Sequence, residues 1–221
     1  MDRILRAESG WQDALAGALR DAPRPIDVDA RFMPRPAADG VIRSRYDRRA
    51  MPPARLASTL LVLYPGPDGE LRLPLTVRNA EMRSHAGEVS LPGGASEERD
   101  VSREATAVRE AFEEIGVDAG AVTILGALDD VWIPVTNFEI RPFVGALAAQ
   151  PEMSPQSDEV ALIVELPVRD LMHEGAITDE IVHGPGWTLR VGGYRASGQL
   201  VWGATARTLA MFATVLRGID V

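Results

Sequence analysis

The order of the predicted strands and helices limits most strongly what this chain can fold into. Apolar runs bounded by turn residues predict strands at 56–64 and 70–78, and the strongest helical periodicity covers 102–115. Further elements are expected as strands over 121–132, 138–148, 160–165 and within 180–202, and as helices over 11–20, just after 166–167, and over 205–217. Because no regular strand–helix–strand repeat joins these elements, a doubly wound sheet is disfavoured. We expect an α+β fold with a mixed β-sheet between helices.

The first quarter of the chain differs in composition from the rest. A short amphipathic helix at 11–20 is followed by residues 23–53, where six prolines and seven arginines fall with little periodicity. The compact part begins near Arg55. We therefore expect residues 1–54 to form an N-terminal helix and a loop-rich, Pro/Arg-rich arm, and residues 55–221 to form one folded domain. The arginines of the arm either face a phosphate or a partner, or lie solvated against the domain.

Composition excludes several kinds of site. The chain has no cysteine, which rules out disulfides, a thiol nucleophile and Cys-ligated metals. All of its 23 basic residues are arginine, which excludes a Schiff-base lysine and a P-loop lysine. The formal net charge of −9 opposes general binding to nucleic acid or to an anionic membrane, because both require a positive field.

No segment of the sequence is suited to crossing a membrane. The longest apolar run, around Leu60–Tyr64, is far shorter than the ~20 residues that span a bilayer. The first residues carry acids where a secretory signal needs an unbroken apolar stretch. We expect a soluble, cytoplasmic protein with neither a nucleic-acid nor a membrane partner.

The helix predicted at 102–115 carries the residues best suited to chemistry. At 100° per residue its apolar side chains are expected to form one stripe of Ala105, Val108, Phe112 and Ile115. The opposite face is expected to carry the carboxylates of Glu110, Glu113 and Glu114. Like charges at this spacing destabilise a helix by roughly 0.2–0.5 kcal/mol per pair, and acids in the last turn also meet the negative end of the helix dipole. A hard divalent cation such as Mg²⁺ would remove both penalties; the alternative is a solvated acidic face.

A glycine pair lies just upstream of this helix. Gly93 and Gly94 follow Leu91-Pro92, and Gly94 stands fifteen residues before Arg109. Adjacent glycines let the backbone approach a ligand closely, and a helix N-terminus presents free N–H groups to an anion. A glycine loop, a helix and a carboxylate cluster within 24 residues therefore indicate a metal–phosphate site. Taken alone, the Pro-Gly-Gly run would be an ordinary turn.

Together these residues resemble the Nudix box, written GX5EX7REUXEEXGU with U a bulky apolar residue. Gly94 supplies the first glycine, and the run REAFEEIGV completes the REXXEEXG part. The loop is one residue longer than the pattern, so the early glutamate falls on Asp100 or on Val101. We take Asp100, with Glu104 as a weaker alternative. Ala111 also replaces a bulky residue, which thins the packing behind the loop.

A second stretch is similar to the upstream signature of the coenzyme A pyrophosphatase branch of that family, LLTKR[SA]X3RX3GX3FPGGX. The positions whose spacing fits are Arg78, Arg83, Gly87 and the Pro-Gly-Gly turn. The positions that depart from the signature are Val77, Asn79 and Leu91. Residues 202–207 (WGATAR) also look like the C-terminal segment of that branch, so the resemblance covers about residues 55–217.

The resemblance implies a Nudix-like mixed β-sheet sandwiched between α-helices (α/β/α), with Mg²⁺ or Mn²⁺ as cofactor. The implied metal site consists of Glu110, Glu113, Glu114 and Gly94. The implied catalytic group consists of Glu113, Glu159 and Arg109, with Glu113 contributing either a ligand or a base. The implied substrate-binding group consists of Arg78, Arg83, Gly93 and Gly94.

Several of these residues also have a non-functional interpretation. Arg78 and Arg83 are otherwise exposed strand and loop charges, and Glu159 is otherwise a solvated loop charge. His85 either orients substrate or binds a loop carbonyl. Asp129 and Asp130 are expected to be structural.

Three functions remain open at this point. The resemblance favours metal-dependent hydrolysis of the diphosphate bond of coenzyme A or its thioesters, giving 3′,5′-ADP and (acyl-)4′-phosphopantetheine. The same chemistry on another nucleoside diphosphate derivative, such as ADP-ribose, is the first alternative. A non-catalytic nucleotide-binding regulatory module is the second, although all three glutamates are present. The expected partner is a small-molecule nucleotide, and the assembly allowed for is a homodimer.

Overall fold

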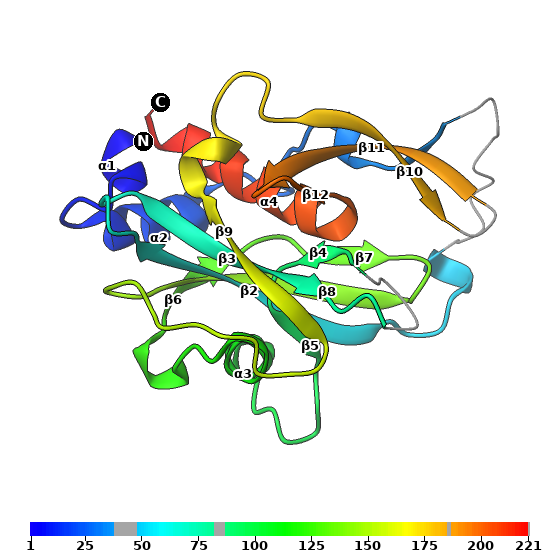
Figure 1. The fold of residues 1–221 in the computed structure, drawn as a ribbon, viewed down its shortest axis with the longest axis horizontal. Coiled ribbons are helices and arrows are strands. Elements are labelled where there is room, and N and C mark those ends of the chain that lie inside the picture. The colour runs from blue at the N-terminus through cyan, green and yellow to red at the C-terminus, as the bar shows by residue number, and fades with distance from the viewer. Residues whose placement is uncertain (38–47, 82–86, 185–186, 221) are drawn as a thin grey trace.

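The computed structural model describes residues 1–37, 48–81, 87–184 and 187–220. It confirms an α+β fold in which a mixed β-sheet lies between helices (Figure 1). Helix α3 (Arg103–Ile115) covers one face of this sheet, and helices α2 (Trp11–Asp21) and α4 (Gly203–Arg217) pack on the opposite side. None of the helices in the described ranges is long and apolar enough to span a membrane.

The main sheet has eight strands in the described residues. They are β2 (Arg55–Pro65), β3 (Leu71–Arg78), β4 (Val89–Ser90), β5 (Gly93–Ala95), β6 (Thr123–Ala127), β7 (Val131–Ile133), β8 (Phe138–Ala146) and β9 (Val160–Pro167). Strand β2 is central: it runs parallel to β8 and antiparallel to β3 and β5. Strand β9 pairs with β3, which brings two segments far apart in sequence side by side.

A smaller sheet completes the molecule. Its strands are β1 (Arg35–Pro36), β10 (Thr178–Gly184), β11 (Trp187–Ala196) and β12 (Gln199–Val201). The remaining helical segments are α1 (Asp2–Leu5) and the 3₁₀ turns η1 (Ala30–Phe32), η2 (Arg48–Ala50), η3 (Ala119–Ala121), η4 (Val168–Leu171) and η5 (Gly218–Asp220).

Two hydrophobic cores flank β2, which explains why its sequence is apolar at almost every position. Leu60, Val62 and Tyr64 point to the α3 side, and Leu61 and Leu63 point to the α2 and α4 side. All five side chains are fully buried. A strand covered on both faces has a continuous apolar run in its sequence, without alternation of apolar and polar residues. The run from Leu60 to Tyr64 is of this kind.

The N-terminal segment belongs to the larger of these cores. Trp11, Leu15 and Leu19 of α2, together with Ile26 and Phe32 beyond it, are buried in the same cluster as α4. Their periodicity had predicted the helix, and α2 confirms it.

Several arginines in the described part of the arm pair with acids. Arg24 donates to Asp129 Oδ1 at 2.7 Å, and Arg31 donates to Asp29 Oδ2 at 2.8 Å. The side chain of Arg48 pairs with Glu139. The pairs formed by Arg24 and Arg48 join the arm to the domain, whereas the Arg31 pair lies within the arm. Arg43 and Arg45 lie outside the described residues.

Two expectations about elements need correction. The strand expected over 121–132 is two strands, β6 and β7, separated by a break at 128–130. There Asp129 accepts hydrogen bonds from Arg24 and from the Ile26 N–H, and Asp130 accepts from Arg141. Both acids are therefore structural, as expected. The helix expected just after 166–167 is only the 3₁₀ turn η4, because β9 continues to Pro167.

Candidate active site

Helix α3 has sharply defined ends, which fix the position of its glutamates. At its start, the Ser102 side chain accepts a hydrogen bond from the Ala105 N–H at 3.1 Å, a standard N-cap. At its end, Gly116 adopts a left-handed conformation (φ 75°), and its N–H donates to Phe112 O. The helix predicted over 102–115 is thus confirmed to within one residue.

The buried face of α3 differs from the expected stripe. Ala107, Ala111 and Ile115 pack on β2, whereas Phe112 is 56% exposed. Glu114 lies on the buried side, with only 7% of its surface exposed. The small alanines face β2, and Glu114 lies on the same buried side of the helix. The stripe with Phe112 was therefore wrong, because small residues set the contact.

The glycine pair lies directly against α3 and β2. In β5, Gly94 pairs with Ser58 of β2, and a Cβ on Gly94 would stand 2.5 Å from Glu110 Oε1. A Cβ on Gly93 would stand 2.4 Å from the Ser58 carbonyl oxygen. The Gly93 N–H donates to Glu114 Oε2 at 3.2 Å. Only glycine fits at either position without displacing a neighbour, so the close backbone approach expected from the sequence is present.

Of the two carboxylates of α3 at this strand, Glu114 is buried and Glu110 is half-buried. The pKa of Glu114 is raised to about 7, mainly by burial and also by the neighbouring Glu110 and Glu159, while the Gly93 N–H and Arg78 oppose the shift. Burial also raises the pKa of Glu110 above its usual range, against the opposing effect of Arg109. Two carboxylates that resist ionisation side by side form a site that a positive charge would stabilise.

Strands β3 and β9 bring an ion pair to the same place. Arg78 Nη2 donates to Glu159 Oε2 at 3.0 Å, across 81 positions of sequence. Both groups act electrostatically on Glu114, with opposite signs. The site thus contains Gly93, Gly94, Glu110, Glu114, Arg78 and Glu159, six of the positions named from the sequence.

The guanidinium of Arg109 is surrounded by acids and also donates to the Ala95 carbonyl oxygen of β5 at 3.2 Å. Its Nε and Nη2 each donate to Asp100 at 2.9 Å, and its Nη1 donates at 2.8 Å to both Glu110 and Glu113. Asp100 also accepts from the Thr106 hydroxyl. The guanidinium holds the pKa of Asp100 well below its usual range. Asp100 is therefore the carboxylate that fastens the loop to the helix, while Val101 is 93% exposed.

Glu113 stands apart from Glu110 and Glu114. Its carboxylate is 41% exposed and accepts from Arg99 at 3.0 Å as well as from Arg109. No sequence pattern marked Arg99 as its partner, since Arg99 lies in an irregular loop. Among the described residues, no three His, Asp or Glu side chains already form a metal-binding group. Arg83 and His85 lie outside the described residues.

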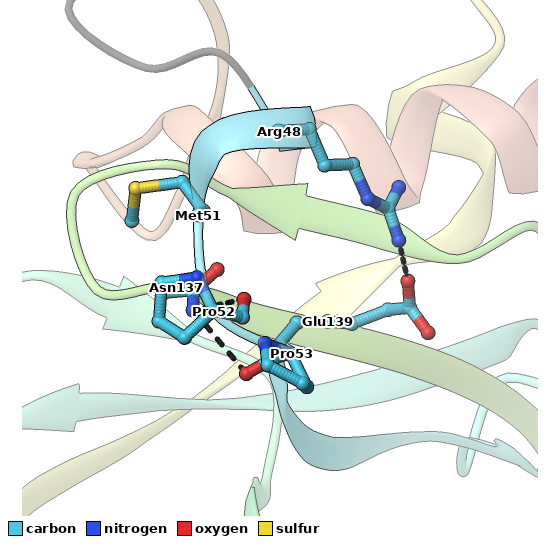
Figure 2. A pocket seen from close by; sticks show the side chains of 7 residues that line it. Arg48, Met51, Pro52, Pro53, Asn137 and Glu139 are labelled. Atoms are coloured by element: carbon cyan, nitrogen blue, oxygen red, sulfur yellow. Dashed lines mark hydrogen bonds and ion pairs between the residues drawn. The ribbon is translucent and has the colours of Figure 1, made fainter.

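A separate hollow of about 360 Å³ lies between the arm and the start of β8 (Figure 2). Its lining consists of Arg48, Met51, Pro52, Pro53, Ala54, Asn137 and Glu139. The side chain of Asn137 ties this region together: Nδ2 donates to the carbonyls of Pro52 and Pro53, and Oδ1 accepts from Trp132. None of the positions named from the sequence as site residues lines this hollow.

Comparison with known proteins assigns the family. The sequence matches the NUDIX domain over residues 59–183, a range that holds most of β2 and all of the glycine strand and α3. The chain belongs to the Nudix family.

Two curated relatives are named Nudix hydrolases. The protein named uncharacterized Nudix hydrolase NudL from Pectobacterium atrosepticum is 41% identical over 108 residues, which cover 49% of this chain and 54% of that protein. Nudix hydrolase 22, chloroplastic, from Arabidopsis thaliana is 34% identical over 179 residues, which cover 76% of this chain and 59% of that protein. The chain thus spans between half and two thirds of the length of these two relatives.

A solved structure supports the Nudix fold. A MutT/nudix family protein from Enterococcus faecalis superposes with a TM-score of 0.50, at 14% identity, over 77% of this chain and 69% of that one. Nudix hydrolases generally use divalent metal ions. The residues of this site fit such an ion, because Glu110 and Glu114 are hard oxygen donors whose burial opposes their ionisation. Gly94 also leaves open the space beside Glu110 that a Cβ would fill.

Proposed function

We propose that the protein hydrolyses the diphosphate bond of coenzyme A or its thioesters, giving 3′,5′-ADP and (acyl-)4′-phosphopantetheine. One observation carries the diphosphate chemistry. The glycine strand β5 lies against the buried carboxylate of Glu114 and the half-buried carboxylate of Glu110, beside the cationic side chain of Arg78. This combination provides ligands for a divalent cation and a guanidinium for a phosphate at one place.

The proposed metal ligands are Glu110, Glu114 and the carbonyl oxygen of Gly94. Mg²⁺ or Mn²⁺ bound there would neutralise phosphate oxygens and lower the pKa of an attacking water. Two carboxylates suffice for Mg²⁺, which commonly completes its coordination with water and substrate phosphate. Glu113 is a further ligand or a base in this proposal, and its carboxylate becomes available when its ion pairs with Arg99 and Arg109 open.

The remaining residues have supporting roles in this proposal. Glu159 is the general base, and Arg78 and Arg83 hold the phosphates through bidentate hydrogen bonds. Arg109 was placed in the catalytic group on the resemblance. Since its guanidinium donates to Asp100, Glu110 and Glu113, we assign it a positioning role.

The choice of coenzyme A is supported by the sequence signature around Arg78, not by a feature of the site itself. Coenzyme A carries a 3′-phosphate in addition to its diphosphate. A chain of net charge −9 must concentrate cations near the site to attract so anionic a substrate. Another nucleoside diphosphate derivative, such as ADP-ribose, is the second candidate, because the diphosphate chemistry would be the same.

The test is a panel of coenzyme A, dephospho-coenzyme A and ADP-ribose, with products identified by mass spectrometry. We expect coenzyme A to be cleaved fastest. Glu114→Gln should lower metal-dependent turnover by about a hundredfold or more, since metal catalysis contributes several kcal/mol. Glu104→Gln, an exposed acid on the same helix, is the matched control and should keep its activity. Faster hydrolysis of ADP-ribose would contradict the substrate, and no hydrolysis at all would favour a binding module.

A further inference from the structure

The ion pair between Arg78 and Glu159 joins a mostly buried guanidinium to an exposed carboxylate, on two backbone segments that are hydrogen-bonded to each other. The Arg78 side chain is 23% exposed, but the carboxylate of Glu159 is 58% exposed. Around them the backbone is fixed: Asn79 N–H donates to Glu159 O at 2.8 Å, and Asn79 Nδ2 donates to Asp158 O at 3.2 Å. The two charged groups are therefore held within reach of each other by the pairing of β3 and β9.

The Arg78 guanidinium is only partly satisfied by this pair. Its Nε is buried and finds no hydrogen-bond partner among the described residues. The β3–β9 register shifts between Val77 and Arg78, an irregularity of the kind that re-aims a side chain beside an active site. The guanidinium thus has one donor that its ion pair with Glu159 does not use, and its positive charge acts on Glu114.

The carboxylate is a weak partner compared with a phosphate. Exposed ion pairs contribute little to stability, because water screens them and ordering two side chains is entropically unfavourable. A phosphate accepts two parallel hydrogen bonds from one guanidinium, and charge-assisted contacts of that kind are among the strongest in proteins. A diphosphate entering the site would therefore displace Glu159 from Arg78.

We propose that Glu159 is an internal competitor for phosphate at Arg78, and that binding of a diphosphate exchanges one anion for the other. The exchange forms and breaks only hydrogen bonds and ion pairs. Its consequence is that the Glu159 carboxylate is freed beside Glu114 only when substrate occupies the site. This inference rests on the proposed function, in which Glu159 is the general base. It explains how Glu159 can be paired with Arg78 before substrate binds and still act as the base afterwards.

Binding of methylenediphosphonate measures the exchange without turnover, because its P–C–P bridge resists hydrolysis. The full chain would be titrated by calorimetry in Mg²⁺. We expect Glu159→Gln and Glu159→Ala to bind the probe about two- to fivefold more tightly than the native chain, the gain from removing one exposed ion pair. Asp158→Asn, which removes one negative charge from the same loop without touching the Arg78 pair, is the matched control and should bind as the native chain does.

A double-mutant cycle makes the result specific to Arg78. Arg78→Gln should weaken binding about tenfold or more, the loss expected for one charge-assisted contact. In that background Glu159→Gln should give no further tightening. In steady-state assays Glu159→Gln should lower KM while kcat falls.

The proposal is overturned if both Glu159 variants bind like Asp158→Asn, or if the tightening persists without Arg78, which would make it a general charge effect. Either result leaves hydrolysis by the native chain intact, whereas failure of the proposed function would appear as no hydrolysis of any diphosphate.

Discussion

The burial of Glu114 shows why the site needs a positive charge. Its carboxylate is nearly buried and receives one hydrogen bond, from the Gly93 N–H. A second carboxylate, Glu110, lies close enough to raise its pKa further. Without a cation the folded state must therefore either protonate Glu114 or keep a poorly solvated charge.

This predicts a pH dependence of folding for the metal-free protein. The folded pKa of Glu114 is about 7, above its ordinary value, so wild-type stability falls as pH rises from the ordinary range through 7. Glu114→Gln has no such proton to lose. At pH 8 the variant should be more stable than wild type by about 1–3 kcal/mol, and at pH 5 the two should converge.

Urea unfolding in a chelator at pH 5, 6, 7 and 8 would measure this difference. Parallel stability profiles for the two proteins would mean that Glu114 is not desolvated in the folded state. Added Mg²⁺ should stabilise the wild type and have a smaller effect on the variant, because the ion favours the charged carboxylate.

At the residue scale, the sequence predicted which residues belong to the site better than it predicted which way their side chains point. The spacing of Glu110, Glu113 and Glu114 marked all three correctly as neighbours on a helix. It did not separate Glu114, which turns inward, from Glu113, which turns to Arg99. That separation depends on which side of α3 faces the sheet, and two alanines lie on that side, whereas the large Phe112 is exposed.

At the element scale, the two glycines of β5 should respond differently to a side chain. Gly94→Ala would push a methyl group against the Glu110 carboxylate, a movable side chain. Gly93→Ala would push one against the Ser58 backbone oxygen, which cannot move without breaking the β2–β5 pairing. We expect Gly94→Ala to reduce turnover more than stability, and Gly93→Ala to destabilise the fold by about 1–3 kcal/mol.

Thermal unfolding and steady-state kinetics on the same two preparations would check this contrast. Equal activity of Gly94→Ala and wild type would show that Glu110 has room to move without consequence. Loss of stability in Gly94→Ala as large as in Gly93→Ala would contradict the assignment of the two contacts.

The fastening of the loop to α3 gives a second prediction at this scale. Asp100 is 5% exposed and accepts two hydrogen bonds from Arg109, so Asp100→Asn should cost about 1–3 kcal/mol at pH 7. The folded pKa of Asp100 is lowered, so its contribution is present above the unfolded pKa and is lost as pH falls through the folded one. The cost of the substitution should therefore shrink below about pH 4. Urea unfolding at pH 7 and pH 3 tests this, and an unchanged cost would contradict it.

Helix ends were predictable where the local sequence carries strong signals. Contacts that depend on which strands pair with each other were not. The end of α3 follows from Gly116, as its sequence indicates, whereas Ser102, included in the predicted helix, is the cap that precedes it. The meeting of Arg78 with Glu159 was not readable, because it depends on the β3–β9 register. Local sequence carries no information on which of several apolar strands will be neighbours.

At the scale of the whole molecule, the N-terminal segment is part of the packing. Leu15 of α2 is fully buried in the core shared with α4, so Leu15→Ala should destabilise the whole protein by about 2–5 kcal/mol. Arg20→Ala, an exposed position on the same helix, should change stability by less than about 0.5 kcal/mol. Denaturant unfolding followed by circular dichroism would show one transition shifted as a unit. A separate, weaker transition in Leu15→Ala would instead mark the segment as an independent part.

The fold class was predictable because the irregular order of strands and helices already excludes the repetitive architectures. The arm was harder, since its prolines and arginines suggest loose structure while Ile26 and Phe32 are buried. Single apolar residues without periodicity give no signal until their contacts are known.

The central position of β2 bears on how the protein opens in solution. Its first half pairs with β8 on one side and with the glycine strand on the other, and its second half is buried between two cores. Amide protons of such a strand exchange with solvent only when the entire structure unfolds, whereas peripheral elements exchange through smaller openings. The anchor of the glycine strand thus belongs to the slowest-exchanging part of the molecule. Local fluctuations that expose the β10–β11 hairpin to solvent would leave the carboxylates of α3 in place beside the glycine strand.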